Sequence, residues 1–356
     1  MFSKESTHPI TDALRAVIAG LPDPIVALDA EGIVLAHNAK SGALAPALRP
    51  GQPISLGLRM PEVLDGVRRA AATGTAQRVE FTARVPVDSW FEVHITPVKL
   101  NEGAPRPDLI FVTLHDLTPF RRVEEMRADF VANASHELRT PLASLTGFIE
   151  TLQGSARDDV AARDRFLAIM KQQANRMARL IDDLLSLSRI ELNAHMRPNE
   201  RVDVVAVVRQ VSDTMQTLAR DRGVEITIDA PAEPLIVGGD RDELVRVCEN
   251  LIENALKYGA SGKRVDIAVR RTIGVDHHAE AVVSVRDHGP GIAPEHLPRL
   301  TERFYRVDVG QSRAEGGTGL GLAIVKHILN RHLGRLSIES IVGQGATFIM
   351  RLPVAE

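Results

Sequence analysis

Apolar residues recur at three- and four-residue steps along two stretches in the middle of the chain, which is the spacing of one face of a helix. Residues 154–159 between them are small and polar and indicate a turn. We therefore predict a hairpin of two long helices within residues 117–195. The first apolar stripe comprises Val131, Ala134, Leu138, Leu142, Leu145, Ile149 and Leu152, and the second comprises Met170, Ala174, Met177, Ile181 and Leu184.

A hairpin of two amphipathic helices does not bury both of its apolar stripes by itself. A four-helix bundle made by two copies of the chain would bury them, so the pattern favours a homodimer. A two-helix layer packed on another domain of the same chain is the alternative.

The sequence on either side of the hairpin is rich in strand-forming residues. Residues 11–116 predict a small α+β domain, with a strand–turn–strand over 21–34 and further strands at 78–85, 91–98 and 109–115. Residues 200–356 predict an α/β sandwich. Its strand-like runs are 224–228, 265–271, 281–286, 335–339 and 346–352, and its helical runs are 240–258 and 320–332. The expected fold class is an α+β multidomain protein.

Composition narrows the possible classes of function. The chain has 356 residues, a net charge of -3 and a single cysteine. This balance disfavours a globally basic nucleic-acid binder, and one cysteine excludes an internal disulfide framework or a zinc cluster of paired cysteines. No apolar run is long enough for a membrane helix and no secretion signal precedes the first domain. We expect a cytoplasmic protein; the alternative is the cytoplasmic portion of a longer inner-membrane protein.

His136 is the first candidate for chemistry. It lies two residues from Ala134 and from Leu138, about 200° around the helix, so it should point away from the apolar seam. The neighbouring Glu137 is able to accept a ring proton and free the other nitrogen for attack. Pro141 removes a helical hydrogen bond, so a bend is expected there. A plain polar surface is the alternative for this His–Glu pair.

A second candidate face lies on the helix predicted over 240–258. Asp240 and Glu243 have the spacing of a capping box and mark its start. Cys248 belongs to its apolar stripe and is expected in the core. Four polar residues share a neighbouring face: Asn250, Asn254, Lys257 and Tyr258. Asn oxygens suit Mg²⁺ and Lys suits phosphate, whereas simple solvent exposure is the alternative.

Three glycine motifs follow this helix. Asp287-His288-Gly289-Pro290-Gly291 comes at the end of a predicted strand, where a buried carboxylate could accept an amine such as that of adenine. Gly316-Gly317-Thr318-Gly319-Leu320-Gly321 precedes a helix, and such backbone binds phosphate. Gly343-Gln344-Gly345 precedes the last strand. The polar stretch around 304–313 is a candidate lid. Neither the Walker loop nor the dinucleotide fingerprint is matched.

Taken in order, these motifs resemble the sensor histidine kinases of two-component systems. The ordered set is His-Glu-x-x-Thr-Pro, Asn-x-x-x-Asn-x-x-Lys-Tyr, Asp-x-Gly-x-Gly, Phe-Tyr and the two later glycine motifs, and it covers about residues 120–353. Residues 130–152 resemble the phosphate-regulon sensor kinases in particular. Residues 21–38 and 116–118 resemble a PAS domain that leads into a signalling helix.

The resemblance implies a domain order and a set of roles. Residues 11–116 would be a PAS-like sensory domain, 117–195 the dimerisation and phosphoacceptor hairpin, and 200–356 the ATP-binding domain of the histidine kinase/Hsp90-type ATPase class. His136 would be the phosphoacceptor, Glu137 its base, and Thr140 the residue that positions water in dephosphorylation of the partner. The residues implied for Mg²⁺–ATP are Asn250, Asn254 (the metal ligand), Lys257, Tyr258, Asp287 (for adenine), Gly289, Gly291, Arg306, Arg313, Gly317, Thr318, Gly319, Leu320 and Gly321.

The implied activity is autophosphorylation of His136 from ATP, followed by transfer to an aspartate in the receiver domain of a response regulator. The resemblance also implies dephosphorylation of that regulator and a role in phosphate-starvation signalling. A phosphatase-dominated regulator of the same fold and an ATP-binding scaffold or ATPase are the alternatives.

Overall fold

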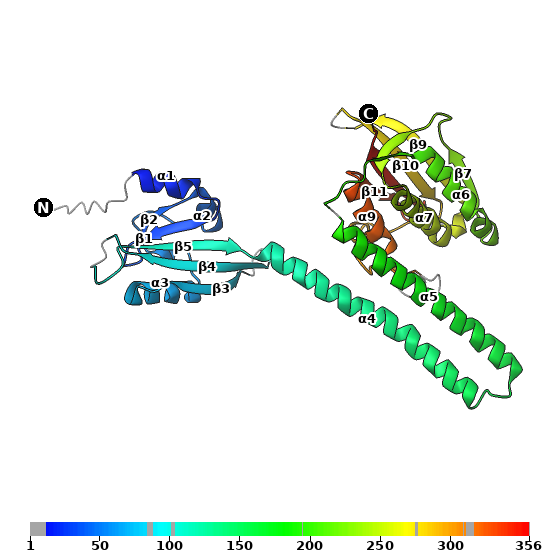
Figure 1. The fold of residues 1–356 in the computed structure, drawn as a ribbon, viewed down its shortest axis with the longest axis horizontal. Coiled ribbons are helices and arrows are strands. Elements are labelled where there is room, and N and C mark those ends of the chain that lie inside the picture. Colours follow the sequence, from blue (N-terminus) through cyan, green and yellow to red (C-terminus); the bar gives the residue numbers. More distant parts are fainter. Residues whose placement is uncertain are drawn as a thin grey trace. The chain divides into compact units, whose positions relative to one another are not determined.

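The computed structural model describes residues 12–83, 88–100, 104–193, 195–274, 277–308, 310 and 317–355. The chain forms two compact units, Met1–Asp129 and Phe130–Glu356, and each is described by itself (Figure 1).

The first unit is built on a five-stranded antiparallel sheet with the order β2-β1-β5-β4-β3. Strands are present in all four predicted regions, but the second strand of the 21–34 region begins only at Val34 and runs beyond the predicted end, and residues 84–85 of the 78–85 region lie outside the described ranges. Its elements are α1 (Asp12–Gly20), β1 (Ile25–Leu28), β2 (Val34–His37), α2 (Ala39–Leu44), the 3₁₀ turn η1 (Ile54–Leu56), α3 (Pro61–Thr73), β3 (Gln77–Ala83), β4 (Ser89–Val98) and β5 (Leu109–Asp116).

Two apolar layers cover this sheet. On one face, α3 packs through Val63, Val67 and Ala70. On the other, Ile18 of α1 packs against β1, β2 and β5. Asp29 makes the first predicted turn, because its Oδ1 accepts the backbone N–H groups of residues 31 and 33 at 3.0 and 2.8 Å.

Two long helices, α4 (Thr118–Gln153) and α5 (Val160–Leu192), form the predicted hairpin. The helix α4 continues through Pro141. Asp159 caps α5 by accepting the N–H of Ala162 at 2.9 Å. The rings of Phe148 and Phe166 join the two helices near their connection, with centroids 5.2 Å apart.

The rest of the second unit is an α/β sandwich. Its main sheet has the order β11-β12-β10-β9-β7, with β7 and β9 parallel, and α6, α7 and α9 pack on one face (Figure 1). Its elements are β6 (Glu200–Asp203), α6 (Val204–Asp221), β7 (Glu225–Asp229), β8 (Ile236–Gly239), α7 (Arg241–Tyr258), η2 (Ala260–Gly262), β9 (Arg264–Ile273), β10 (Ala279–Asp287), η3 (Leu297–Arg299), α9 (Gly321–Arg331), β11 (Arg335–Ser340) and β12 (Ala346–Pro353). The five predicted strands and both predicted helices are present.

Apart from the short 3₁₀ turns η2 and η3, three elements of this sandwich were not predicted, namely α6, β6 and β8. The strands β6 and β8 form a small sheet of their own. Helix α6 begins with five consecutive apolar residues, four of them valine (Val204, Val205, Val207 and Val208), and such a run has no clear helical period. The helix forms because these β-branched residues fill the core beside α7.

The end of the hairpin joins the core of the sandwich. Leu180, Leu187 and Ile190 of α5 are buried in one apolar cluster with α6, α7 and α9. The alternative considered for the hairpin, packing on another domain, therefore holds for this part of α5. Leu138 and Leu184 of the stripes also pack against this cluster, whereas Val131 and Ile149 remain exposed.

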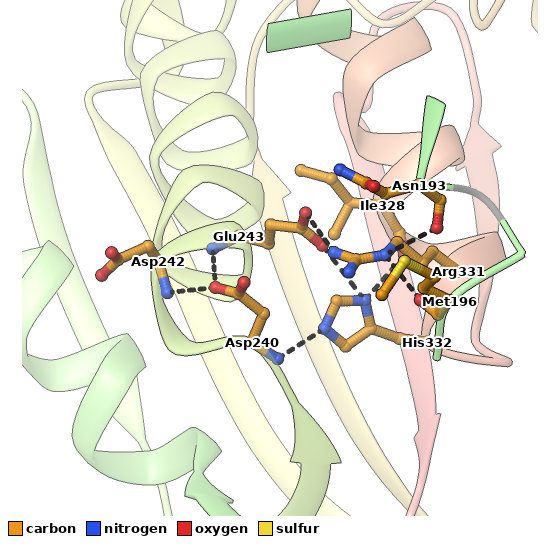
Figure 2. A network of polar contacts seen from close by, with 8 residues as sticks. All are labelled: Asn193, Met196, Asp240, Asp242, Glu243, Ile328, Arg331 and His332. Atoms are coloured by element: carbon orange, nitrogen blue, oxygen red, sulfur yellow. Dashed lines mark hydrogen bonds and ion pairs between the residues drawn. The ribbon is translucent and has the colours of Figure 1, made fainter. Parts of the chain in front are cut away.

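A polar network fastens the linker that follows α5 (Figure 2). Arg331, the last residue of α9, donates from Nε to the backbone oxygens of Asn193 and Met196 at 3.2 and 2.9 Å. Its Nη1 pairs with Oε1 of Glu243, in the first turn of α7. The start of α7, the end of α9 and the linker are thereby tied together.

The capping box predicted at the start of α7 is only half made. Asp240 accepts the N–H groups of Asp242 and Glu243 at 3.0 and 3.1 Å, as expected. The reciprocal bond does not come from Glu243, which is turned toward Arg331. Instead Nε2 of the buried His332 accepts the N–H of Asp240 at 3.0 Å (Figure 2).

None of the helices in the described ranges combines the length and the apolar composition that crossing a membrane requires.

Candidate functional site

A pocket of about 320 Å³ opens on the sandwich where α7, the end of β10 and the segment before α9 meet. Most of the residues predicted for nucleotide binding line it: Asn250, Asn254, Lys257, Tyr258, Asp287, Gly291, Arg306, Gly317, Thr318, Gly319 and Gly321. Gly289 and Leu320 lie beside lining residues in the chain without lining the pocket themselves. Arg313 lies outside the described residues.

The polar face of α7 is positioned by the burial of its opposite face. Cys248 is in the core as predicted, and burial raises the pKa of its thiol to about 12. The Asn250 side chain donates from Nδ2 to the Arg246 carbonyl at 2.9 Å. Lys257 is largely buried and pairs with Glu253 one turn earlier at 2.8 Å. This lysine is therefore held at the pocket wall rather than extended into solvent.

Asp287 ends β10 and is 5% exposed. Its Oδ1 accepts the N–H groups of Gly289 at 2.9 Å and Ala346 at 3.3 Å. Burial raises the pKa of this carboxyl, and the two backbone bonds oppose that rise. Gly291 has φ +70°, and a Cβ there would lie 2.2 Å from the carbonyl oxygen of Ile341. The motif thus needs glycine both for conformation and for space.

The segment before α9 forms a second wall. Gly319 has φ +75°, and its carbonyl accepts the N–H of Phe304 at 2.7 Å. The Thr318 hydroxyl accepts the N–H of Leu320 at 3.3 Å. The helix α9 then starts at Gly321, so its N-terminal end faces the pocket. Backbone N–H groups at such an end favour an anion.

One arginine connects this pocket to the hairpin. Arg306 is almost fully buried and donates from Nη2 to the Thr318 carbonyl at 2.8 Å and to Oε2 of Glu137 at 2.9 Å. The same Oε2 also accepts from Nη2 of Arg176, on α5, at 2.7 Å. The carboxylate beside His136 is therefore held by two guanidinium groups.

His136 itself is exposed on α4, as its helical position predicted. Its carbonyl accepts the Thr140 hydroxyl at 3.2 Å. Among the residues described, no group of three or more His, Cys, Asp or Glu side chains is arranged to hold a metal ion.

Sequence reasoning missed the contribution of α5 to this pocket. Arg179, Asp182 and Asp183 line it from the hairpin side. Asp183 accepts from Nη2 of Arg246 at 2.8 Å and from the Thr318 hydroxyl at 2.7 Å. On a helical wheel these residues look like an ordinary solvated face. Only the packing of α5 against the sandwich brings them to the pocket.

Three family models match the chain in succession. Residues 18–122 match the PAS fold, residues 126–193 the His Kinase A (phospho-acceptor) domain, and residues 239–356 the Histidine kinase-, DNA gyrase B-, and HSP90-like ATPase.

Several curated proteins are similar. The Phosphate regulon sensor protein PhoR of Pseudomonas aeruginosa is 36% identical over 350 residues, which are 98% of this chain and 75% of that protein. The Sensor protein kinase WalK of Staphylococcus saprophyticus is 37% identical over 240 residues, 67% of this chain and 38% of that protein. A crystal structure of histidine kinase ThkA in complex with response regulator protein TrrA covers 96% of this chain and 98% of that chain, with a TM-score of 0.51 and 19% identity, and supports the fold.

The succession of three domains and the near full-length likeness agree with the site, in which an exposed histidine on a helical hairpin shares a unit with a pocket lined by a glycine-rich segment. This chain belongs to the sensor histidine kinases of two-component systems.

Proposed function

We propose that this kinase phosphorylates itself on His136 from Mg²⁺–ATP and passes the phosphoryl group to an aspartate of a response regulator. The observation that supports this assignment of residues is the pair of hydrogen bonds that Arg306 donates. This side chain reaches Glu137, next to His136, and Thr318 in the pocket at 2.9 and 2.8 Å. A single residue therefore bridges Glu137, the neighbour of the proposed phosphoacceptor, and Thr318 in the segment proposed to bind phosphate.

The pocket offers distinct partners to the two ends of ATP. Both backbone bonds of Asp287 end on Oδ1, so Oδ2 is assigned to the exocyclic amine of adenine. Tyr258 lies on the same wall and is assigned to the nucleoside. Lys257, held by Glu253, supplies a point charge for a phosphate.

The other end of the pocket suits the phosphates. The N-terminus of α9 and the glycine-rich backbone from Gly317 to Gly321 offer N–H donors. The oxygens of Asn254 and Asn250 fit Mg²⁺, which keeps several waters and takes oxygen ligands. Bound there, Mg²⁺ would neutralise charge on the phosphate oxygens.

The transfer itself requires little covalent work from the protein. A ring nitrogen of His136 attacks the γ-phosphorus, the bond from that phosphorus to the β,γ-bridging oxygen breaks, and ADP leaves. The proton lost by the imidazole goes to Glu137. Because Glu137 meets Arg176 and Arg306 in the arrangement described, its carboxylate must turn from these groups toward the imidazole in that step.

A homodimer is proposed for the same hairpin. The apolar side chains of α4 and α5 that are exposed in the single chain include Val131, Leu142, Ile149, Ile181 and Leu185. A row of exposed apolar residues on paired helices is what a second hairpin would cover in a four-helix bundle.

The likeness to the Phosphate regulon sensor protein PhoR supports a role in phosphate-starvation signalling. The test is transfer from purified, radiolabelled kinase to the individual response regulators of the source organism. Fastest labelling of a phosphate-responsive regulator would support this role, whereas preference for another regulator would refute it.

The site assignment is tested by the same labelling with γ-³²P-ATP and Mg²⁺. We expect His136→Ala to abolish acid-labile labelling without changing ATP affinity, because His136 does not line the pocket. His195→Ala, at another exposed histidine, is the matched control and should label normally. Labelling of the His136→Ala protein would overturn the assignment. Asp287→Asn should weaken ATP binding about tenfold or more, since it removes a charged acceptor from a buried site.

Dephosphorylation of the regulator is proposed as a second activity of this site. Thr140 lies one turn from His136 and is exposed. Thr140→Ala should retain autophosphorylation and lose most dephosphorylation of the labelled regulator. Equal loss of both activities would contradict this role.

A further inference from the structure

The phosphate end of the pocket contains an acidic side chain that does not belong to the ATP-binding sandwich. Asp183 comes from α5 of the hairpin, and its side chain is 19% exposed. Its Oδ2 accepts the Thr318 hydroxyl at 2.7 Å, and its Oδ1 accepts from Arg246 at 2.8 Å. A distance of 2.7 Å between a hydroxyl and a carboxylate oxygen is that of a charge-assisted hydrogen bond.

The bond to Asp183 occupies the hydroxyl proton of Thr318, which a bound nucleotide would need as a hydrogen-bond donor. A hydroxyl has one proton and donates to one acceptor at a time. Thr318 stands at the head of the phosphate-binding backbone, so its proton goes either to Asp183 or to a phosphate oxygen. Asp182, which also lines the pocket, adds a second negative charge on the same side.

Arg246 also holds the Asp183 carboxylate, at 2.8 Å. Its guanidinium lies on α7 and offsets the charge of the carboxylate. When phosphates enter, they bring negative charge next to Asp183 and compete for Thr318. Repulsion between the phosphates and the Asp183 carboxylate would weaken the bond between Asp183 and Thr318, most strongly where water is excluded.

We propose that Asp183 is a latch between the hairpin and the phosphate loop, which the phosphates of an adenine nucleotide displace by taking the hydroxyl of Thr318. Nucleotide binding thereby releases the loop from α5 and frees the ATP-binding part to approach His136. This inference rests on the proposed nucleotide site, and it adds a residue of the hairpin to the control of that site.

Affinity measured by titration calorimetry on the full chain tests the latch. We expect Asp183→Ala to tighten the binding of Mg²⁺–ADP about three- to tenfold, the equivalent of one hydrogen bond to a charged group. Adenosine has no phosphate, so its affinity should not change. The matched control is Asp182→Ala, which removes the same charge from the same pocket without breaking a bond to Thr318, and should give a gain of about twofold or less.

A double-mutant cycle separates the bond from the charge. In a Thr318→Val background the gain from Asp183→Ala should disappear, because no hydroxyl remains to be released. Equal gains from Asp182→Ala and Asp183→Ala, or a gain that persists with Val at residue 318, would overturn the latch. Weaker binding after Asp183→Ala would also overturn it, since Asp183 would then support the loop. A wild-type chain that binds no adenine nucleotide would instead refute the nucleotide site itself.

Discussion

The buried histidine at the end of α9 predicts how the stability of the second unit depends on pH. His332 accepts a backbone N–H through Nε2 and donates from Nδ1 to the Ile328 carbonyl at 2.8 Å. This pair of bonds requires the neutral ring with its proton on Nδ1. Burial lowers the pKa of His332 from its ordinary value of 6.5, although Glu243 opposes the change.

The size of the effect follows from proton linkage. The folded state resists protonation, while the unfolded chain takes up a proton as the pH falls through 6.5. The stabilising contribution is therefore complete above this pH and is lost below it. Between pH 7.5 and pH 5.5 the loss approaches about 1.4 kcal/mol for a ring that stays neutral in the folded state.

The assay compares the wild type with His332→Gln by urea denaturation across this pH range. The variant should be less stable at pH 7.5 by about 1–3 kcal/mol, through lost packing and a weaker acceptor for the Asp240 N–H. The stability difference between variant and wild type should shrink by up to about 1.4 kcal/mol at pH 5.5, since Gln does not titrate. Circular dichroism is the suitable probe, because the single tryptophan, Trp90, lies in the other unit.

Taking the difference between two proteins removes the titration of all other groups, including His327, whose pKa burial also lowers. A disadvantage of the variant that stays constant from pH 7.5 to pH 5.5 would refute the reasoning. It would mean that His332 takes up a proton equally in the folded and unfolded states.

Three further predictions concern packing and backbone. Leu187→Ala, at a fully buried residue of α5, should cost about 2–5 kcal/mol in urea denaturation, whereas Leu185→Ala, two residues earlier and exposed, should cost about 0.5 kcal/mol or less; similar losses would contradict the packing of α5 on the sandwich. Gly291→Ala should lower the melting temperature and weaken ATP binding, because its Cβ would lie 2.2 Å from the Ile341 oxygen; normal binding would exclude this steric conflict. Cys248, with a pKa raised to about 12, should resist a thiol reagent at pH 8 in the folded chain and react fully in urea; rapid labelling of the folded chain would show that it is accessible.

The sequence was sufficient for the elements whose apolar residues have a regular period. The helices α4, α5 and α7 and the strands of both large sheets lie where the pattern predicted them. The helix α6 was missed because a run of β-branched residues is compatible with either a strand or a buried helix. Packing against the neighbouring helices decides that this run forms a helix, and the local sequence pattern carries no information about that packing.

The same distinction applies to the candidate site. Asn250, Asn254 and Asp287 were found because motif spacing places them on elements that fold locally. Arg176 and Asp183 were missed because they belong to a different helix and reach the site only through tertiary packing. The incomplete capping box at Asp240 has a similar cause. The spacing allows Glu243 to bond back to the Asp240 N–H, but its carboxylate pairs instead with Arg331, which is distant in the sequence.

Helix α9 connects the pocket at its first residue to the linker after α5 at its last residue. Its first residue, Gly321, lines the pocket, and its last, Arg331, donates hydrogen bonds to the backbone of Asn193 and Met196 in the linker. At about 1.5 Å per residue, its 11 residues form a rod roughly 16 Å long. A hydrogen-bonded helix of this length is stiff along its axis, so the two ends are held at a fixed separation. One short helix thus joins the wall of the pocket to the linker that follows α5.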